Sequence, residues 1–196
     1  MSAKKLSVNQ EIRLLRSLKN AEILGNGSSR IVFVDPRDSN RIVKLAIGAC
    51  SFFQNRNEVR FWQRTEANQL AKIYEFGRFC VVMERAQFVV LDDEDYQYNL
   101  DDEARDDAEQ IVYWLEENLG TTADNYQVGM MKDGRWASFD YGFLPGVHAL
   151  NQCGWADYIR DNLNEIRQYI DKCVDILQRK RPITEIERQY KGVADF

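Results

Sequence analysis

Residues 137–142, ASFDYG, follow the segment MKDGRW, which is typical of a tight β-turn between two strands. They place Asp140 at the end of a predicted strand, and an aromatic residue and a glycine come next. A carboxylate in this position is either a metal ligand or the end of a surface hairpin. The two interpretations differ in what they require elsewhere, because a metal site needs further polar residues beside Asp140.

The composition is that of an ordinary globular protein. The chain has 196 residues, of which 44% are hydrophobic and 29% charged, and it fits one domain or one domain of two small lobes. The net charge of -5 disfavours a general nucleic-acid-binding surface. No apolar run approaches the roughly 20 residues that span a membrane, and residues 1–20 lack the apolar core of a signal peptide. We therefore expect a cytoplasmic protein without membrane contact.

The cysteines and the single histidine do not predict a metal centre. Cys50, Cys80, Cys153 and Cys173 form no CxxC pair, and His148 has no second histidine at ligand spacing. We expect free thiols in a reducing compartment.

Hydrophobic periodicity predicts an α+β fold. Val8, Ile12, Leu15 and Leu18 recur at helical spacing and predict a helix over residues 8–19. The other predicted elements are three strands within 21–48 joined by a Gly-rich turn and a proline turn, a helix over 51–67, two strands within 70–86 joined at Gly77, a helix over 108–120, a hairpin before Asp140, and a long helix over about 155–181.

An acidic segment separates the two halves of the chain. Residues 92–109 hold ten acids in eighteen positions. The ordinary interpretation is a solvated loop and a helix start, since acids favour helix N-termini. The alternative is that residues 92–107 form an acidic surface that contacts a basic protein partner.

Several residues have the types and order that a nucleotide site needs. Gly25 and Gly27 lie in a predicted hairpin, where their missing Cβ atoms let backbone amides approach phosphates. Lys44 alternates with apolar residues on a strand, so it either faces solvent or reaches a phosphate. Glu58 lies on the next predicted helix and could hold Lys44 by an ion pair, and Asp140 ends the later hairpin.

This order resembles the protein-kinase-like fold, over roughly residues 20–145. The resemblance implies a two-lobed protein that uses ATP with magnesium. In it, Gly25 and Gly27 match the first two loop glycines, while Arg30 stands where the third is expected. Lys44 matches the phosphate-binding lysine, and Glu58 matches its ion-pair partner.

The same resemblance assigns the rest of the site. DYG stands where the family has DFG, so Asp140 matches the magnesium-binding aspartate. The connector at residues 83–86, which includes Glu84, would face the adenine with its backbone. Asn125 would be the second metal ligand in one possible alignment of the catalytic loop.

The catalytic loop departs from the family pattern, which has an aspartate as base and a metal-binding asparagine five positions later. The chain reads LGTTADNYQ before the hairpin. If Asn125 is the metal ligand, the base position falls on Gly120. If the usual hairpin length is kept, Gln127 replaces the asparagine and Thr122 stands at the base position. Asp124 is the nearest acid that could be recruited as base, but it fits neither alignment.

The residues alone leave three functions open. The first is a degenerate kinase-like protein that acts mainly through partner binding and retains some nucleotide affinity. The second is an active small phosphotransferase in which Asp124 or a water replaces the base. In the third, an interaction protein unrelated to kinases, Lys44 and Glu58 are ordinary surface charges and Asp140 caps a turn.

The resemblance also implies a division of the chain. We predict an N-terminal lobe over residues 1–86, built on a five-stranded antiparallel sheet with one main helix. A reduced helical C-terminal lobe over residues 87–196 would carry the hairpin and DYG.

Overall fold

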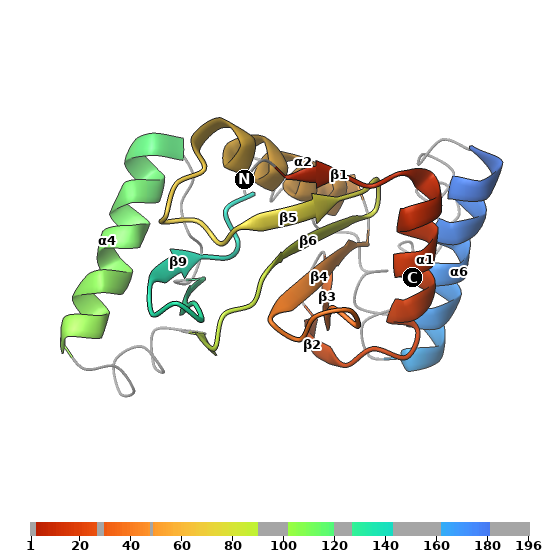
Figure 1. The fold of residues 1–196 in the computed structure, drawn as a ribbon, viewed down its shortest axis with the longest axis horizontal. Coiled ribbons are helices and arrows are strands. Elements are labelled where there is room, and N and C mark those ends of the chain that lie inside the picture. Colours follow the sequence, from red (N-terminus) through yellow and green to blue (C-terminus); the bar gives the residue numbers. More distant parts are fainter. Residues whose placement is uncertain are drawn as a thin grey trace, which may run out of the picture.

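The computed structural model describes residues 3–26, 30–47, 49–89, 102–119, 127–142 and 162–180 (Figure 1). Within these ranges the chain is an α+β protein with a mixed six-stranded sheet, a three-stranded sheet and four helices, so the predicted class is confirmed. The main sheet contains β1 (Lys4–Lys5), β2 (Ile23–Asn26), β3 (Arg30–Val34), β4 (Arg41–Ala46), β5 (Ile73–Phe76) and β6 (Cys80–Glu84). The small sheet contains β7 (Phe88–Val89), β8 (Val128–Met130) and β9 (Trp136–Ser138). The helices are α1 (Val8–Leu18), α2 (Ala49–Thr65), α4 (Asp102–Leu119) and α6 (Leu163–Arg179).

The main sheet has the order β1-β5-β6-β4-β3-β2. Five of these strands are antiparallel neighbours, as predicted, but β1 adds a sixth strand that runs parallel to β5. The prediction of a purely antiparallel five-stranded sheet is therefore wrong. The sequence of β1 is only a pair of lysines, and its strand conformation comes from backbone pairing with β5, which continues in the 2.8 Å bond from Leu6 N to Phe76 O.

The predicted helix 8–19 is confirmed as α1, and a capping box explains where it begins. The Ser7 hydroxyl accepts from Gln10 N at 3.3 Å, and the Gln10 side chain accepts from Ser7 N at 2.9 Å. The predicted helices over 51–67 and 108–120 correspond to α2 and α4, although α4 begins earlier, at Asp102.

Alternation along the central strands gives the main sheet two apolar faces, each with its own core. On β4, Val43 and Leu45 join α1 and α6 in one core. Ile42 of β4 joins the other core, which contains residues of α2, α4 and the small sheet. Lys44 shares this second face by the same alternation, so its position on β4 directs it towards α2.

The helix α6 packs beside α1, and the two helices run along one end of the molecule in Figure 1. Its buried Tyr169 donates a hydrogen bond to Ala46 O at the end of β4, at 2.7 Å. α6 covers part of the long helix predicted from residue 155; residues 155–161 lie outside the described ranges. The division of the chain after residue 86 stays a prediction, and the last described helix completes the core of the N-terminal sheet.

The predicted hairpin before Asp140 is confirmed as β8 and β9, and β7 extends it to three strands. Backbone bonds tie this small sheet to the segment before β5. Ala71 N donates to Ser138 O at 2.8 Å, and Ser138 N donates to Gln69 O at 2.8 Å. The residues after β9 are thereby held against the main body of the protein. Within the described part of the chain, no helix combines the length and apolar character needed to cross a membrane.

Candidate functional site

Lys44 and Glu58 meet in the interior, as the sequence predicts. The Lys44 ammonium donates to Glu58 Oε1 at 2.8 Å, and both residues are almost completely excluded from solvent, at 2% and 0% exposure. Lys44 comes from the middle of β4 and Glu58 from the middle of α2, which packs against β4, β5 and β6. The alternative that both are solvated surface charges is therefore wrong.

Arg30 is the member of this cluster that sequence reasoning missed. One guanidinium nitrogen donates to Glu58 Oε1 at 2.8 Å, and the other donates to Asp140 Oδ1. Asn55 Oδ1 also accepts from the guanidinium, at 3.4 Å. Arg30 is 4% exposed, whereas the Asp140 side chain keeps 23% of its surface in solvent. The guanidinium thus links the two carboxylates of the site.

The strand register explains why Arg30 reaches this position. Val32 of β3 lies opposite Lys44 of β4, and Arg30 lies opposite Ala46. Arg30 and Val32 are two residues apart, so their side chains leave the same face of the sheet as that of Lys44. This shared face is the signal that could have identified Arg30, because a cation at the start of an otherwise apolar strand needs a buried partner.

The residues before and after Asp140 in the sequence hold it in place. Phe139 N donates to Gln127 O at 3.1 Å, and Phe139 O accepts a hydrogen bond from the Lys44 ammonium. Gly142 then lies against α2, where a Cβ would come within 2.3 Å of Gln54 O. This close approach requires glycine, so the final residue of DYG sets how near Asp140 comes to Glu58.

The cluster contains two cations and two carboxylates, and their opposite charges offset the cost of burial. Burial would raise the pKa of Asp140, but the charges of Arg30 and Lys44 lower the pKa below its ordinary value. Burial and the neighbouring Arg30 charge lower the pKa of Lys44, against the opposing effect of Glu58. The Arg30 pKa is raised because Asp140 and Glu58 outweigh its burial. Arg30 and Asp140 are therefore both charged at neutral pH.

The geometry limits what the site can bind as it stands. Asp140 is the cluster's solvent-accessible carboxylate, and Arg30 already donates to one of its oxygens. Glu58 Oε2 is buried without a hydrogen-bond donor in the described part of the chain. No group of three or more metal-ligating carboxylates, cysteines or histidines occurs among the described residues. A cation can reach Asp140 fully only after the guanidinium moves away.

The other predicted site residues are distributed as follows. Gly25 lies on β2 with open space around the position of its missing Cβ. The Glu84 carboxylate is engaged elsewhere: it accepts from Lys72 N at 3.2 Å and forms an ion pair with Arg135, in the turn before β9. Gly27, Asp124 and Asn125 lie outside the described residues.

The predicted acidic contact surface is described only in its second half. Residues 92–101 lie outside the described ranges, and the remaining acids lie in the first turns of α4. Glu103, Asp106 and Asp107 are solvent-exposed there. Their placement agrees with the ordinary interpretation, in which acids begin a helix, and the partner contact stays a prediction.

Neither a protein-family model nor a curated protein sequence matches this chain.

Proposed function

We propose that this chain is a degenerate kinase-like protein that acts mainly through partner binding, and that Arg30 keeps its nucleotide site closed. The observation that carries the proposal is the buried guanidinium of Arg30, which donates to both Glu58 and Asp140. These are the residues that the resemblance assigns to ion pairing with Lys44 and to magnesium.

Three features support the kinase-like part of the proposal. The antiparallel strands follow the order β2-β3-β4-β6-β5, with α2 inserted between β4 and β5. A lysine on β4 forms an ion pair with a glutamate on α2. The hairpin of β8 and β9 delivers Asp140 to the same place. Each feature recurs in the order that the resemblance requires.

The closed state follows from competition for one carboxylate. Magnesium binds through carboxylate oxygens and phosphates, at near-ideal octahedral geometry. The guanidinium of Arg30 forms a charge-assisted hydrogen bond to Asp140, and such a bond is about twice as strong as a neutral one. ATP with magnesium would therefore have to displace Arg30 from Asp140 Oδ1 before the metal could use both oxygens of this carboxylate. Lys44 would still be present to contact a phosphate.

Efficient phosphoryl transfer is the less supported function. A general base contributes roughly 10²–10⁴ to a rate, and neither alignment of the loop before β8 puts a carboxylate at the base position. The active phosphotransferase with Asp124 as base is the alternative that the following test addresses.

The test measures the melting temperature of the protein with magnesium and ATP at millimolar concentration, together with ADP release. A ligand that binds only the folded state must raise the melting temperature by mass action. We expect a small rise in the wild type, none in Lys44→Ala, and a larger rise in Arg30→Met, each compared with the same variant without nucleotide. Lys132→Ala, on the exposed turn between β8 and β9, is the matched control and should behave as the wild type.

Each alternative gives a different result. Sustained ADP release by the wild type would show an active enzyme and would contradict the degenerate assignment. If magnesium and ATP do not change the melting temperature of any variant, the proposed nucleotide site is refuted. The remaining alternative is then an interaction protein unrelated to kinases. A rise in Arg30→Met no larger than in the wild type would show that Arg30 does not close the site.

A further inference from the structure

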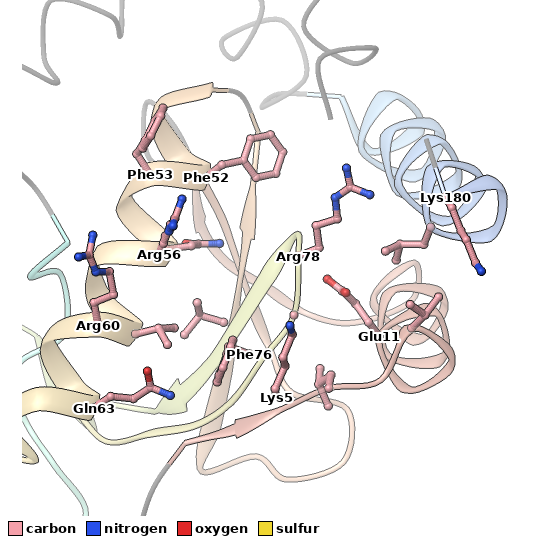
Figure 2. A pocket seen from close by; sticks show the side chains of 17 residues that line it. Lys5, Glu11, Phe52, Phe53, Arg56, Arg60, Gln63, Phe76, Arg78 and Lys180 are labelled. Atoms are coloured by element: carbon pink, nitrogen blue, oxygen red, sulfur yellow. The ribbon is translucent and has the colours of Figure 1, made fainter. Parts of the chain in front are cut away.

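A groove of about 760 Å³ lies beside α2 in the described structure. Figure 2 shows α2 on one side, with Phe52, Phe53, Arg56 and Arg60, and Lys5 and Phe76 on the strand side. Residues at the start of α1 and at the end of α6 form the remaining wall of the groove. We call this cavity the basic groove; it is lined by Lys5, Leu6, Val8, Glu11, Phe52, Phe53, Asn55, Arg56, Val59, Arg60, Gln63, Phe76, Gly77, Arg78, Val81, Leu177 and Lys180.

Five cations line the basic groove in a chain whose net charge is -5. They are Lys5, Arg56, Arg60, Arg78 and Lys180, and the groove holds a single carboxylate, that of Glu11. The groove therefore has the opposite sign to the protein as a whole. A local concentration of charge of this kind raises the encounter rate with ligands of the opposite charge.

Glu11 offsets part of the charge of Arg78, and within the described residues no ion pair joins it to the other four cations. Its side chain is 2% exposed, and its Oε1 accepts from Phe79 N at 2.6 Å and from the Cys80 thiol at 3.8 Å. Burial raises the pKa of Glu11 above its ordinary value, although hydrogen bonds from neighbouring groups oppose the rise. The carboxylate is thus turned into the protein and is partly protonated at a higher pH than an exposed one.

Arg56 and Arg60 lie one turn apart on α2, and both are solvent-exposed. Like charges four residues apart repel each other and cost a helix a few tenths of a kcal/mol. Neither arginine has an ion-pair partner within the described ranges. The only acid of α2 is Glu58, which is committed to the buried cluster. The helix therefore keeps an unneutralised basic face over the groove.

The groove also exposes apolar surface between its cations. Phe53 is 52% exposed and Val8 is 47% exposed, although both have large hydrophobic side chains. Phe52 and Phe76 lie deeper in the groove and are partly buried. Exposed apolar groups bordered by charged ones are typical of protein contact sites.

We propose that the basic groove binds an acidic segment of a partner protein, in which carboxylates alternate with an aromatic or branched apolar side chain. The carboxylates would pair with Arg56, Arg60 and Lys5, and the apolar side chain would contact Phe53. This inference rests on the part of the proposed function that concerns partner binding. It assigns the partner contact to the positively charged basic groove and not to the acidic residues 92–107. A nucleic-acid backbone is disfavoured as the ligand because the chain carries a net charge of -5.

The test uses a labelled synthetic peptide in which two phenylalanines are placed among glutamates, and measures binding by fluorescence anisotropy on the full chain. Charge reversal in the Arg56→Glu/Arg60→Glu variant should weaken binding at least about tenfold, because like charges across an interface repel. Lys132→Glu reverses one charge, half of the change in the double variant, on a hairpin that does not line the groove, and should leave binding within about twofold. Raising the salt from about 0.05 M to about 0.3 M should weaken wild-type binding strongly.

Two comparisons establish the chemistry of the ligand. A peptide with glutamines in place of the glutamates should bind far more weakly, and so should one with alanines in place of the phenylalanines. If the reversed variant does not fold, as judged by circular dichroism, Arg56→Gln/Arg60→Gln removes the two positive charges without adding negative ones. This variant should also bind the peptide more weakly than the wild type and Lys132→Glu.

Four outcomes would overturn the proposal. They are absence of peptide binding, equal binding by the reversed variant, tighter binding of a single-stranded RNA, and self-association at low salt that the reversal abolishes. The last would assign the groove to a second copy of the chain. The peptide measurements contain no ATP, so failure here with the expected Mg-ATP results refutes only the groove. Peptide binding together with ATP turnover would instead refute only the degenerate assignment.

Discussion

The strongest test of the buried cluster is a double-mutant cycle on Arg30 and Asp140. Arg30→Met removes the guanidinium from a position that is 4% exposed and leaves Lys44 as the single cation for two carboxylates. Breaking a buried ion pair by removing one partner costs about 3–5 kcal/mol, because the remaining charge is left uncompensated. We expect Arg30→Met to lower the free energy of unfolding by that amount.

Asp140→Asn is expected to cost less, about 1.5–3 kcal/mol, since the side chain is 23% exposed and the amide can still accept from Arg30. In the double variant one cation faces one carboxylate again, through the 2.8 Å pair of Lys44 and Glu58. The double variant should therefore lose about 1–3 kcal/mol less than the two single changes added together.

The assay is urea unfolding followed by tryptophan fluorescence and by circular dichroism, with the four proteins measured side by side. Arg13→Met, an exposed position on α1, is the matched control and should change the unfolding free energy by no more than about 0.5 kcal/mol. Additivity within about 0.5 kcal/mol, or a cost of Arg30→Met below about 1 kcal/mol, would show that the guanidinium does not link the two carboxylates.

Three further changes test the surrounding structure. Burial raises the folded-state pKa of Glu11 above 4.5, so the contribution of Glu11 to the unfolding free energy falls as the pH rises from that value towards neutrality. The side chain in Glu11→Gln does not titrate, so the unfolding free energy of this variant relative to wild type should rise over the same pH range. A difference between the two proteins that stays constant with pH would contradict the raised pKa of Glu11. Gly142→Ala should cost about 1–3 kcal/mol because its Cβ would meet a backbone carbonyl of α2 at 2.3 Å, whereas Gly25→Ala, with open space around it, should cost less than half as much in the same urea titration. Tyr141→Phe removes a 2.9 Å bond to Ala71 O in the interior and should cost about 1 kcal/mol, and thermal unfolding that is unchanged would refute that bond.

The local elements of the fold were largely predictable from the sequence. The period of Ile12, Leu15 and Leu18 and the β-rich runs of β3 and β4 are strong local signals, and they gave helices and strands in the right places. Strand β1 was not predictable, because two lysines carry no strand preference and their pairing depends on β5, far along the chain. The position of α6 against α1 was missed for the same reason. The amphipathic pattern of a helix predicts that one face is buried, but it does not predict which element covers that face.

The part of the site that could be predicted is the ion pair for which the motif contains both residues. The pairing of Lys44 with Glu58 followed from their order, and the structure confirms the contact; their role in nucleotide binding stays a prediction. Arg30 was noted only as a replacement for a glycine. Its role depends on the register between β3 and β4, which the periodicity of one strand cannot fix.

The packing of α6 on α1 has a consequence for how the chain is made. The contact of Lys19 with Asp171 joins residues 152 positions apart, so α1 leaves the ribosome long before its partner exists. Until α6 is synthesised, one apolar face of the main sheet lacks its cover, and long-range contacts of this kind form slowly. A fragment that stops before α6 would expose Ile31, Phe33 and Leu45 and should precipitate rather than fold. The core on this face of the main sheet is therefore complete only after α6 has been synthesised.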